Sequence, residues 1–485
     1  MCGIIGGNIY TESSLKQGLK KTRHRGKDNT SWDNIDDLYF GHNRLSIQDL
    51  SAAANQPFWN SDKTVCIVYN GELWGSKLTK ELKDKITIPF KTTSDTEILL
   101  NAYLEFGIDC ISELDGMFAF AIIDTRINKL FIIRDAFGEL PIYYYIDKMT
   151  NKLAFCSELK GLPLSEIYKK QVKLLDAGHF VEYDYTTLEH TLTQWYHLPS
   201  DIINHSRETI ISNIRKDLEE AVKVKMIADV PICTILSGGL DSVIITYLLS
   251  KIKPDVEAFV VSMGEGDTKS DDIKYARIAA KEFGIKLHEI ILTEEDIINS
   301  IEEAIYVIES SRWVNIGPSI AQIALSKKIN ELGFKVVFSG DMADEVFGSY
   351  GHIQAFHYTE ERFDLARRKE IKAVGKTNFI TTSKSIMWGG TVEIRAPFAW
   401  KPFVEYHVNV PPLYRMENGN TKPLLREAFK DEISDELVFR PKVPFHKGAR
   451  TTDLTKPMKE ELEQILKKTF LYKDNINQNK FFDYA

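Results

Sequence analysis

The pattern of apolar residues changes near residue 200, and this change limits the folds open to the chain. From Cys2 to about Tyr196 the apolar runs are short, closely spaced and separated by turn residues, which is typical of strand-rich, largely antiparallel structure. From Glu208 onward, candidate helices alternate with buried strands, which indicates a parallel sheet covered on both faces. A chain of 485 residues also exceeds what one hydrophobic core usually serves. We therefore predict two domains of different architecture, residues 2–196 and residues 207–485.

Several elements can be assigned within this pattern. The helices that the periodicity predicts cover residues 95–106, 208–227, 272–283 and 319–332. Buried strands are predicted over residues 256–263 and 287–292 and in the run FKVVFSG (334–340). Residues 198–207 contain proline, aspartate, asparagine and serine and are predicted to form a linker. Beyond about Tyr350 the pattern is mostly helical, with few strand signals.

Composition narrows the class of protein. The net charge is −8 and the basic residues are dispersed, so no basic stripe for a nucleic acid is visible. No apolar run approaches the ~20 residues that cross a bilayer, and no secretory signal is recognisable. Five scattered cysteines without a CxxC pair indicate a reducing compartment. We expect a cytoplasmic protein with small-molecule partners and without nucleic-acid or membrane partners, and a homodimer is left open.

Cys2 is the first residue with an unusual chemical context. Removal of Met1 would leave a thiol and a free α-amine on one residue. An α-amine has a pKa of about 7.7–8.0 and can act as general base for its own side chain. A cysteine at position 2 is more often incidental than catalytic, so this interpretation depends on the motifs that follow it.

Five motifs follow Cys2 in order. They are RHRGKD (23–28), GHNRLSIQDL (41–50), NQP (55–57), YNGE (69–72) and SDTE (94–97). Together they resemble the class II glutamine amidotransferase domain, an amino-terminal-nucleophile hydrolase, and the similarity extends over essentially the first 190 residues. The resemblance implies an αββα sandwich in which Cys2 releases ammonia from glutamine.

The resemblance also implies roles for individual residues. Arg44 suits the α-carboxylate of glutamine, because its planar fork binds carboxylates bidentately. Asp95 suits the α-ammonium group. Asn70 and the backbone N–H of Gly71 would stabilise the oxyanion of the tetrahedral intermediate. The glutamine-binding positions that match the family are Arg44, Leu45, Ser46, Ile47, Asn70, Gly71, Glu72 and Asp95.

Other residues of the first half are given different roles. His24 and His42 could be taken for catalytic bases, but the α-amine of Cys2 already fills that role, so both are interpreted as structural. Arg25 and Met117 match positions near the entrance of the family's ammonia tunnel. Lys27 and Asn43 differ from the family pattern at positions that are not catalytic.

SGGLDS (237–242) is the first motif of the second half. It lies between a β-branched strand and a helix, where successive backbone N–H groups and the helix dipole can bind phosphate. It is not the GxxxxGK[ST] pattern of P-loop enzymes; it resembles the pyrophosphate-binding loop of enzymes that cleave ATP to AMP and pyrophosphate. This resemblance implies that the residues around ATP are Leu236, Ser237, Gly238, Gly239, Asp241, Ser242, Met263, Ser339 and Gly340.

FSGDMADEVFGSY (338–350) follows another predicted central strand. Ligands of parallel sheets gather at the carboxyl ends of the strands, so Asp241 and Asp344 are predicted to hold Mg²⁺. EIRAPF (393–398) and RPKVPFHKG (440–448) match further family segments, and Lys442 would stabilise charge on the phosphates. Over nearly the whole chain the motifs resemble a glutamine-dependent asparagine synthetase. This implies an α/β and α+β two-domain protein whose C-terminal half is a parallel-sheet ATP-pyrophosphatase domain with additional helices.

The implied reaction adenylates a carboxylate with ATP and then displaces AMP with glutamine-derived ammonia. The family's general base is a glutamate in SGEG, which here is Asp341, followed by Met342 instead of glycine. The PFLD segment reads PFAW, Leu140 replaces a lysine, and residues 311–319, where the acceptor is expected, are atypical. Aspartate is the leading acceptor.

Other functions stay open at this point. The acceptor could be another carboxylate, such as a sugar acid or a natural-product or modified-base precursor. A β-lactam synthetase-like activity is disfavoured because those relatives dispense with glutaminase chemistry, and Cys2 and its partners are intact here. A non-catalytic sensor of glutamine or adenine nucleotide is the alternative outside the enzymes.

Overall fold

The structure is a computed structural model that describes residues 1–165, 170–263, 271–310, 312–354, 359–416, 421–441 and 456–468. The chain forms two compact units. The first unit comprises Met1–His197, Ile227–Val230 and Gly375–Ser383, and the second comprises Leu198–Met226, Pro231–Val374 and Lys384–Ala485. Among the described residues, no helix combines the length and the apolar character needed to cross a bilayer.

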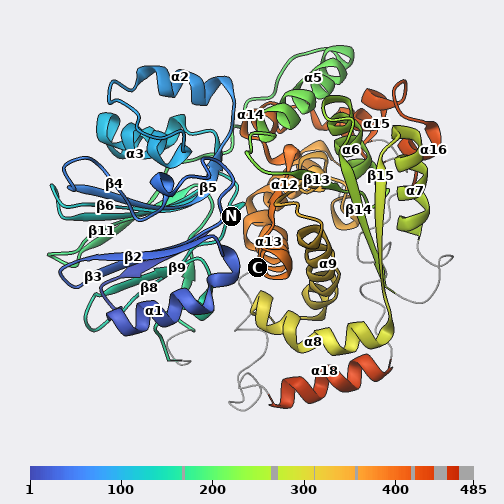
Figure 1. The fold of residues 1–485 in the computed structure, drawn as a ribbon. Coiled ribbons are helices and arrows are strands. Elements are labelled where there is room, and N and C mark those ends of the chain that lie inside the picture. The colour runs from blue at the N-terminus through green and yellow to red at the C-terminus, as the bar shows by residue number, and fades with distance from the viewer. Residues whose placement is uncertain are drawn as a thin grey trace. The chain divides into compact units, whose positions relative to one another are not determined.

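Two antiparallel six-stranded sheets form the first unit (Figure 1). Sheet A has the order β10-β8-β9-β1-β3-β2, and its strands are β1 (Gly3–Gly7), β2 (Asn29–Ile35), β3 (Leu38–Arg44), β8 (Tyr143–Ile146), β9 (Leu153–Cys156) and β10 (Lys173–Leu174). Sheet B has the order β12-β11-β7-β6-β5-β4, and its strands are β4 (Phe58–Trp59), β5 (Val65–Leu73), β6 (Gly116–Asp124), β7 (Lys129–Arg134), β11 (His179–Asp184) and β12 (His190–Gln194).

Helices cover the outer faces of these two sheets (Figure 1). Helix α1 (Glu12–Lys21) packs Leu15 and Leu19 on sheet A, and α3 (Asp95–Phe106), with α2 (Lys77–Lys85) beside it, packs on sheet B. The odd-numbered residues of β5 face α3, so its even-numbered residues point to the opposite face of sheet B. The layers confirm the predicted αββα sandwich.

A parallel sheet forms the centre of the second unit. Sheet C has the order β15-β14-β13-β16-β17, and all its pairs are parallel. Its strands are β13 (Ile232–Ile235), β14 (Glu257–Met263), β15 (Lys286–Leu292), β16 (Val336–Phe338) and β17 (Glu393–Arg395). Strand β13 lies in the middle of the sheet, because β14 and β15 follow on one side of it and β16 and β17 on the other. The predicted parallel sheet is therefore confirmed.

Helices pack on both faces of sheet C, as the buried character of its inner strands β13 and β16 requires (Figure 1). One face carries α8, α9, α18 and part of α13, and the apolar core there includes Phe259, Val261 and Val337. The helices of the second unit are α5 (Arg207–Lys225), α6 (Leu240–Ile252), α7 (Asp271–Phe283), α8 (Glu294–Ile308), α9 (Trp313–Glu331), α10 (Ala343–Phe347), α11 (Gly351–Gln354), α12 (Glu360–Ala373), α14 (Lys401–His407), α15 (Pro423–Phe429), α16 (Asp435–Val438) and α18 (Lys456–Lys468); α13 (Asn378–Gly390) contributes to both units.

The bounds of most elements agree with the predictions, but those of one helix differ. The helix predicted over 319–332 begins six residues earlier, at Trp313, and contains Pro318. Pro318 is the sixth residue of the helix, so the helix lacks the hydrogen bond that an N–H here would make to the carbonyl oxygen of Val314. The short strand β17 was not predicted, because three residues carry little periodicity. All five cysteines are buried and free.

Candidate active site

Cys2 immediately precedes β1, and the sheet register decides what surrounds it. Gly3 pairs with Asn43 of β3, so Cys2 lies beside the end of β3 and the residues that follow. The N–H of Leu45 is 3.4 Å from Cys2 Sγ, and the thiol is 3.7 Å from the carbonyl oxygen of Leu45. The main-chain nitrogen of Cys2 donates to Asn70 Oδ1 at 2.6 Å. Three residues predicted for the glutaminase site are thus in direct contact.

The side chain of Asn70 has a free donor next to Cys2. Asn70 belongs to the even-numbered face of β5, opposite to the face that packs on α3. It is fully buried, and its Nδ2 has no hydrogen-bond partner within the described part of the chain. A buried amide donor without an acceptor costs roughly 1–3 kcal/mol. An acceptor that binds beside Cys2 would recover this cost.

Gly71 is required by the packing of two strands. A Cβ atom at this position would clash with the carbonyl oxygen of Met117 on the neighbouring strand β6. The absence of a side chain therefore has a steric reason that is independent of any chemistry. The proposed use of its N–H in an oxyanion site stays a prediction.

Arg44 is enclosed by the loop that follows it. Its guanidinium donates to the carbonyl oxygen of Ser51 at 2.7 Å, to Asn55 Oδ1 at 2.9 Å and to the carbonyl oxygen of Asp49. Its neighbours Ser46 and Ile47 are also fixed: Ser46 N donates to Asp28 Oδ2 at 2.8 Å, and the carbonyl oxygen of Ile47 accepts from Asp229 N at 2.8 Å. These bonds give the guanidinium one defined orientation.

Two predicted carboxylates contact β5 and its surroundings. Asp95, the first residue of α3, accepts hydrogen bonds from Tyr69 Oη at 3.1 Å and from Leu73 N at 3.0 Å. Glu72 accepts a hydrogen bond from Gln48 Nε2. Both acidic residues are buried. They therefore bring negative charge to β5, the strand that carries Asn70.

The environment of His42 agrees with its structural interpretation. Its Nε2 lies 3.0 Å from the carbonyl oxygen of Tyr69, and the ring is fully buried. Burial lowers the pKa of His42 to about 3, so the ring is neutral at physiological pH. A neutral, buried ring that bonds to the backbone is what a packing role requires.

The second group of predicted residues lies at the carboxyl edge of sheet C. Leu236 directly follows β13, Met263 ends β14 and Ser339 directly follows β16. Gly238 has a φ of +69°, and a Cβ there would lie 2.8 Å from the main-chain nitrogen of Ala276. The SGG loop therefore needs glycine for both its backbone conformation and its close contact with α7.

The SGGLDS and FSGDMADEVFGSY loops are in contact. A Cβ on Gly340 would lie 2.8 Å from the Cβ of Asp241 and 2.9 Å from the nitrogen of Ser242. Ser237 Oγ and Ser242 Oγ are 3.0 Å apart, and Ser237 Oγ also accepts from Gly239 N at 3.4 Å. Gly340 thus allows the two motifs to approach closely, and the predicted nucleotide-binding residues of both loops lie together.

Lys422 links the two carboxylates predicted to hold Mg²⁺. Its Nζ lies 2.5 Å from Asp241 Oδ1 and 2.5 Å from Asp344 Oδ1. Burial alone would lower the pKa of Lys422, but the two carboxylates raise it above its usual value, so the ammonium is charged. The sequence analysis missed this lysine, which precedes Pro423 in a segment without a recognised motif.

This pair of carboxylates fits a divalent cation. Both side chains supply the hard oxygen ligands that Mg²⁺ prefers, and both already contact one cationic group. Among the described residues, no cluster of three or more His, Cys, Asp or Glu side chains could hold a metal ion. A magnesium ion there would therefore complete its coordination with phosphate oxygens and water.

Asp341 is a half-buried carboxylate beside these groups. Ser339 Oγ donates to Asp341 Oδ2 at 2.8 Å. Burial raises the pKa of Asp341, and the charges of Asp344 and Asp241 raise it further. The following residue, Met342, has a φ of +74° and is buried. Left-handed backbone is costly for a side chain of this kind, so the loop is strained where the family has glycine.

The RPK segment contacts the SGG loop. Arg440 Nη1 donates to the carbonyl oxygen of Ser237 at 3.1 Å, and Arg440 Nη2 lies 2.7 Å from Asp272 Oδ1. Arg440 lies in a recognised motif but is not among the predicted site residues. Lys442 lies outside the described residues, so its position is not assigned.

Comparison with known proteins identifies the family. A model of the glutamine amidotransferase domain matches residues 1–206, and a model described as asparagine synthase matches residues 213–385 and 370–485. The chain is 32% identical to asparagine synthetase [glutamine-hydrolyzing] 3 of Arabidopsis thaliana, covering 92% of this chain and 79% of the relative. It is 31% identical to asparagine synthetase [glutamine-hydrolyzing] 1 of Lotus japonicus (92% and 78%) and to asparagine synthetase [glutamine-hydrolyzing] of Sandersonia aurantiaca (92% and 87%). The chain belongs to the family of glutamine-hydrolysing asparagine synthetases.

Proposed function

We propose that this protein is a ligase that forms asparagine from aspartate, ATP and glutamine. The observation that carries the proposal is the match of 31–32% identity over 92% of the chain, which includes both units and both candidate sites. Contacts within each unit support it. The first unit has a cysteine beside a buried amide donor, and the second has a glycine loop beside two carboxylates.

Glutamine hydrolysis is assigned to the first unit. Once Met1 is removed, the α-amine of Cys2 takes the thiol proton, and Sγ attacks the carboxamide carbon of glutamine. Asn70 Nδ2 and the N–H of Gly71 stabilise the oxyanion, and Asn70 Oδ1 holds the amine in place. Ammonia leaves, and water then hydrolyses the thioester to glutamate. The other matched residues bind the substrate: Arg44 its carboxylate, Asp95 its ammonium group, and Leu45, Ser46, Ile47 and Glu72 the remainder.

Adenylation is assigned to the second unit. The backbone of the SGG loop and the N-terminus of α6 bind the phosphates of ATP, with Leu236, Met263, Ser339 and Gly340 around the nucleotide. The acceptor carboxylate attacks the α-phosphorus, and pyrophosphate leaves. Asp241 and Asp344 would hold Mg²⁺, which supplies charge neutralisation on the phosphates when it is bound. Lys422 adds positive charge, and Lys442 is assigned the same role from its match to the family's RPK segment.

Amide formation completes the reaction. Ammonia attacks the acyl carbon of the adenylate, AMP leaves and a proton must be removed from the new nitrogen. Asp341 is the candidate base, because it is the shortened equivalent of the family glutamate. Its raised pKa suits a group that accepts a proton during the reaction.

A pyrophosphate-release assay tests the acceptor. With ATP, Mg²⁺ and ammonium, the wild-type protein is expected to release pyrophosphate when aspartate is added and to form asparagine in equal amount. Asp341→Asn is expected to keep releasing pyrophosphate but to form little asparagine, since the base acts after adenylation, and Asp341→Glu should stay active. Pyrophosphate release that does not respond to aspartate would contradict the proposed acceptor.

The second candidate function is amidation of a different carboxylate. The observation that favours it is Met342, whose buried side chain and left-handed backbone stand where the family has glycine. A strained residue beside the candidate base can mark a pocket of altered shape. A screen of sugar acids and other carboxylates in the same assay separates this function from asparagine formation.

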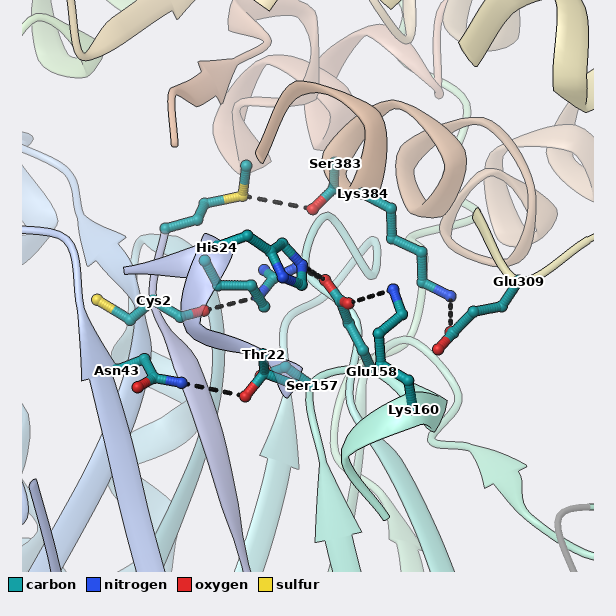
Figure 2. Close-up of polar contacts among 12 residues, drawn as sticks. Cys2, Thr22, His24, Asn43, Ser157, Glu158, Lys160, Glu309, Ser383 and Lys384 are labelled. Carbon is teal, nitrogen blue, oxygen red and sulfur yellow. Dashed lines mark hydrogen bonds and ion pairs between the residues drawn. The ribbon is translucent and has the colours of Figure 1, made fainter. Parts of the chain in front are cut away.

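Replacing Asn70 tests the oxyanion site. Asn70→Ala is expected to lower the kcat of glutamine hydrolysis by about 100- to 1,000-fold, because the loss of one oxyanion donor has this effect. The matched control is Asn43→Ala, a buried asparagine whose Nδ2 bonds to the carbonyl oxygen of Leu19 at 2.9 Å and to Thr22 Oγ1 at 3.1 Å (Figure 2). Asn43→Ala should lower the melting temperature and leave kcat nearly unchanged. Equal kcat losses in both variants would point to folding instead of catalysis.

A further inference from the structure

Glu158 is a buried carboxylate with three basic partners close to Cys2 (Figure 2). It follows β9 and is fully buried. Its Oε1 accepts from His24 Nε2 at 2.9 Å and from Arg25 Nη1 at 2.9 Å, and its Oε2 accepts from Lys160 Nζ at 2.8 Å. Arg25 matches a position near the entrance of the family's ammonia tunnel, but none of the four residues takes part in the proposed glutaminase steps.

Arg25 connects this cluster to the nucleophile. Its Nε donates to the carbonyl oxygen of Cys2 at 2.8 Å, while Nη1 bonds to Glu158. Arg25 is fully buried, and its Nη2 has no hydrogen-bond partner in the described ranges of the chain. Glu158 is its only ion-pair partner among those residues. The orientation of the guanidinium therefore depends on Glu158, because an uncompensated charge would be expensive to bury.

Cys2 is consequently held at both ends of its main chain. Its nitrogen bonds to Asn70, and its carbonyl bonds to Arg25. Ser157, next to Glu158, bonds to both the nitrogen and the carbonyl of Ile4, at 3.0 Å and 2.9 Å. In a nucleophile that uses its own α-amine, the main-chain orientation sets where both the thiol and its base point.

We infer that Glu158 is a positioning residue for Cys2, which it orients through Arg25. The inference rests on the proposed glutaminase reaction. It adds Glu158, a residue to which the family motifs assign no role. Misplacing a reacting atom by about 1 Å can cost about 100-fold in rate, so a remote anchor of the main chain can control kcat.

The charge state of Glu158 supports a permanent role. Burial alone would raise the pKa of Glu158, but the charges of His24, Lys160 and Arg25 hold it well below its usual value. Glu158 is therefore ionised over the whole range in which the α-amine of Cys2 can be deprotonated. The ion pair between Glu158 and Arg25 therefore persists over this pH range.

Lys160 offers a matched control within the same cluster. It bonds to Oε2 of Glu158, whereas Arg25 bonds to Oε1, so Lys160→Met leaves the path from Glu158 through Arg25 to Cys2 intact. Glu158→Gln keeps an acceptor for Arg25 but removes the charge, and Glu158→Ala removes both. A positioning role and a merely structural role therefore predict different rankings of these variants.

The experiment measures glutamine hydrolysis, ammonia-driven synthesis and melting temperature for the three full-length variants. We expect kcat for glutamine to fall about 100-fold in Glu158→Ala and about 10-fold in Glu158→Gln, with KM changed less than about threefold. Lys160→Met should keep kcat within about threefold of wild type even where its melting temperature falls as much as that of Glu158→Gln. Ammonia-driven synthesis should be unchanged in all three.

Several results would overturn the inference. They are a kcat loss in Lys160→Met equal to that in Glu158→Gln, an increase of KM without loss of kcat, or a wild-type kcat in Glu158→Gln. If Glu158→Ala does not fold, the comparison of Glu158→Gln with Lys160→Met still decides. Absence of glutamine hydrolysis in the wild-type protein would contradict the proposed function itself, and this outcome is visible before any variant is made.

Discussion

Replacing Cys2 with alanine is expected to abolish glutamine-driven amide formation and to leave ammonia-driven formation near the wild-type rate. In the proposed scheme the thiol is the nucleophile of the glutaminase reaction only, so its loss should lower glutamine-driven kcat by at least about 1,000-fold. The fold should tolerate the change. The side chain is small, its Sγ bonds to the main chain of Leu45, and the bonds of the Cys2 main chain to Asn70 and Arg25 remain.

The measurement compares the two nitrogen sources in the same pyrophosphate-coupled assay. Cys66→Ala is the matched control, because Cys66 is a fully buried free cysteine of β5 in the same unit without a proposed role. It should retain both activities, apart from a loss of stability. Mass spectrometry of the active protein should find Cys2 as the first residue, since a retained Met1 would block the α-amine. Loss of ammonia-driven synthesis in a folded Cys2→Ala protein would contradict the two-site scheme.

The fold was predictable to a large extent because its signals are local. Helix α3 has the predicted bounds, and strands β14 and β15 start within one residue of theirs, since periodicity and flanking turn residues mark them. The start of α9 was not predictable from such rules, because the packing of the helix accommodates Pro318 against its usual preference. Strand β17 depends on its pairing with β16, which no local pattern contains.

The candidate sites divide in the same way. Cys2, Asn70 and Asp241 lie in recognisable motifs, and the sheet registers bring them to their partners. Lys422 was missed because its partner Asp241 is 181 residues away, and nothing in its own segment marks it. Glu158 lies outside the motifs described above, and its bond to Arg25 spans 133 residues. Contacts of this range follow from the sheet topology, which a single sequence does not specify.

Replacing Asp241 with asparagine is expected to have the second large effect, on pyrophosphate release. Asp241 lies in the SGGLDS loop, packs against Gly340 of the other loop and shares Lys422 with Asp344. An asparagine keeps the shape of the side chain but removes one of the two charges that would hold Mg²⁺ against the phosphates. Loss of one such electrostatic contribution lowers kcat by about 100- to 1,000-fold.

Two comparisons decide whether this effect belongs to the nucleotide site. Asp217→Asn is the control, because Asp217 is an aspartate of the same unit that pairs with His407 at 3.0 Å and has no proposed catalytic role. It should keep pyrophosphate release, while Asp241→Asn and Asp344→Asn should both lose it and both retain free glutaminase activity. Lys422→Met distinguishes the role of the lysine from that of Mg²⁺. If the lysine only neutralises the carboxylates, a higher Mg²⁺ concentration should restore pyrophosphate release by this variant. If the ammonium itself contacts the phosphates, a higher Mg²⁺ concentration should not restore it. Near-wild-type pyrophosphate release by Asp241→Asn would contradict the placement of the ATP site at these two loops.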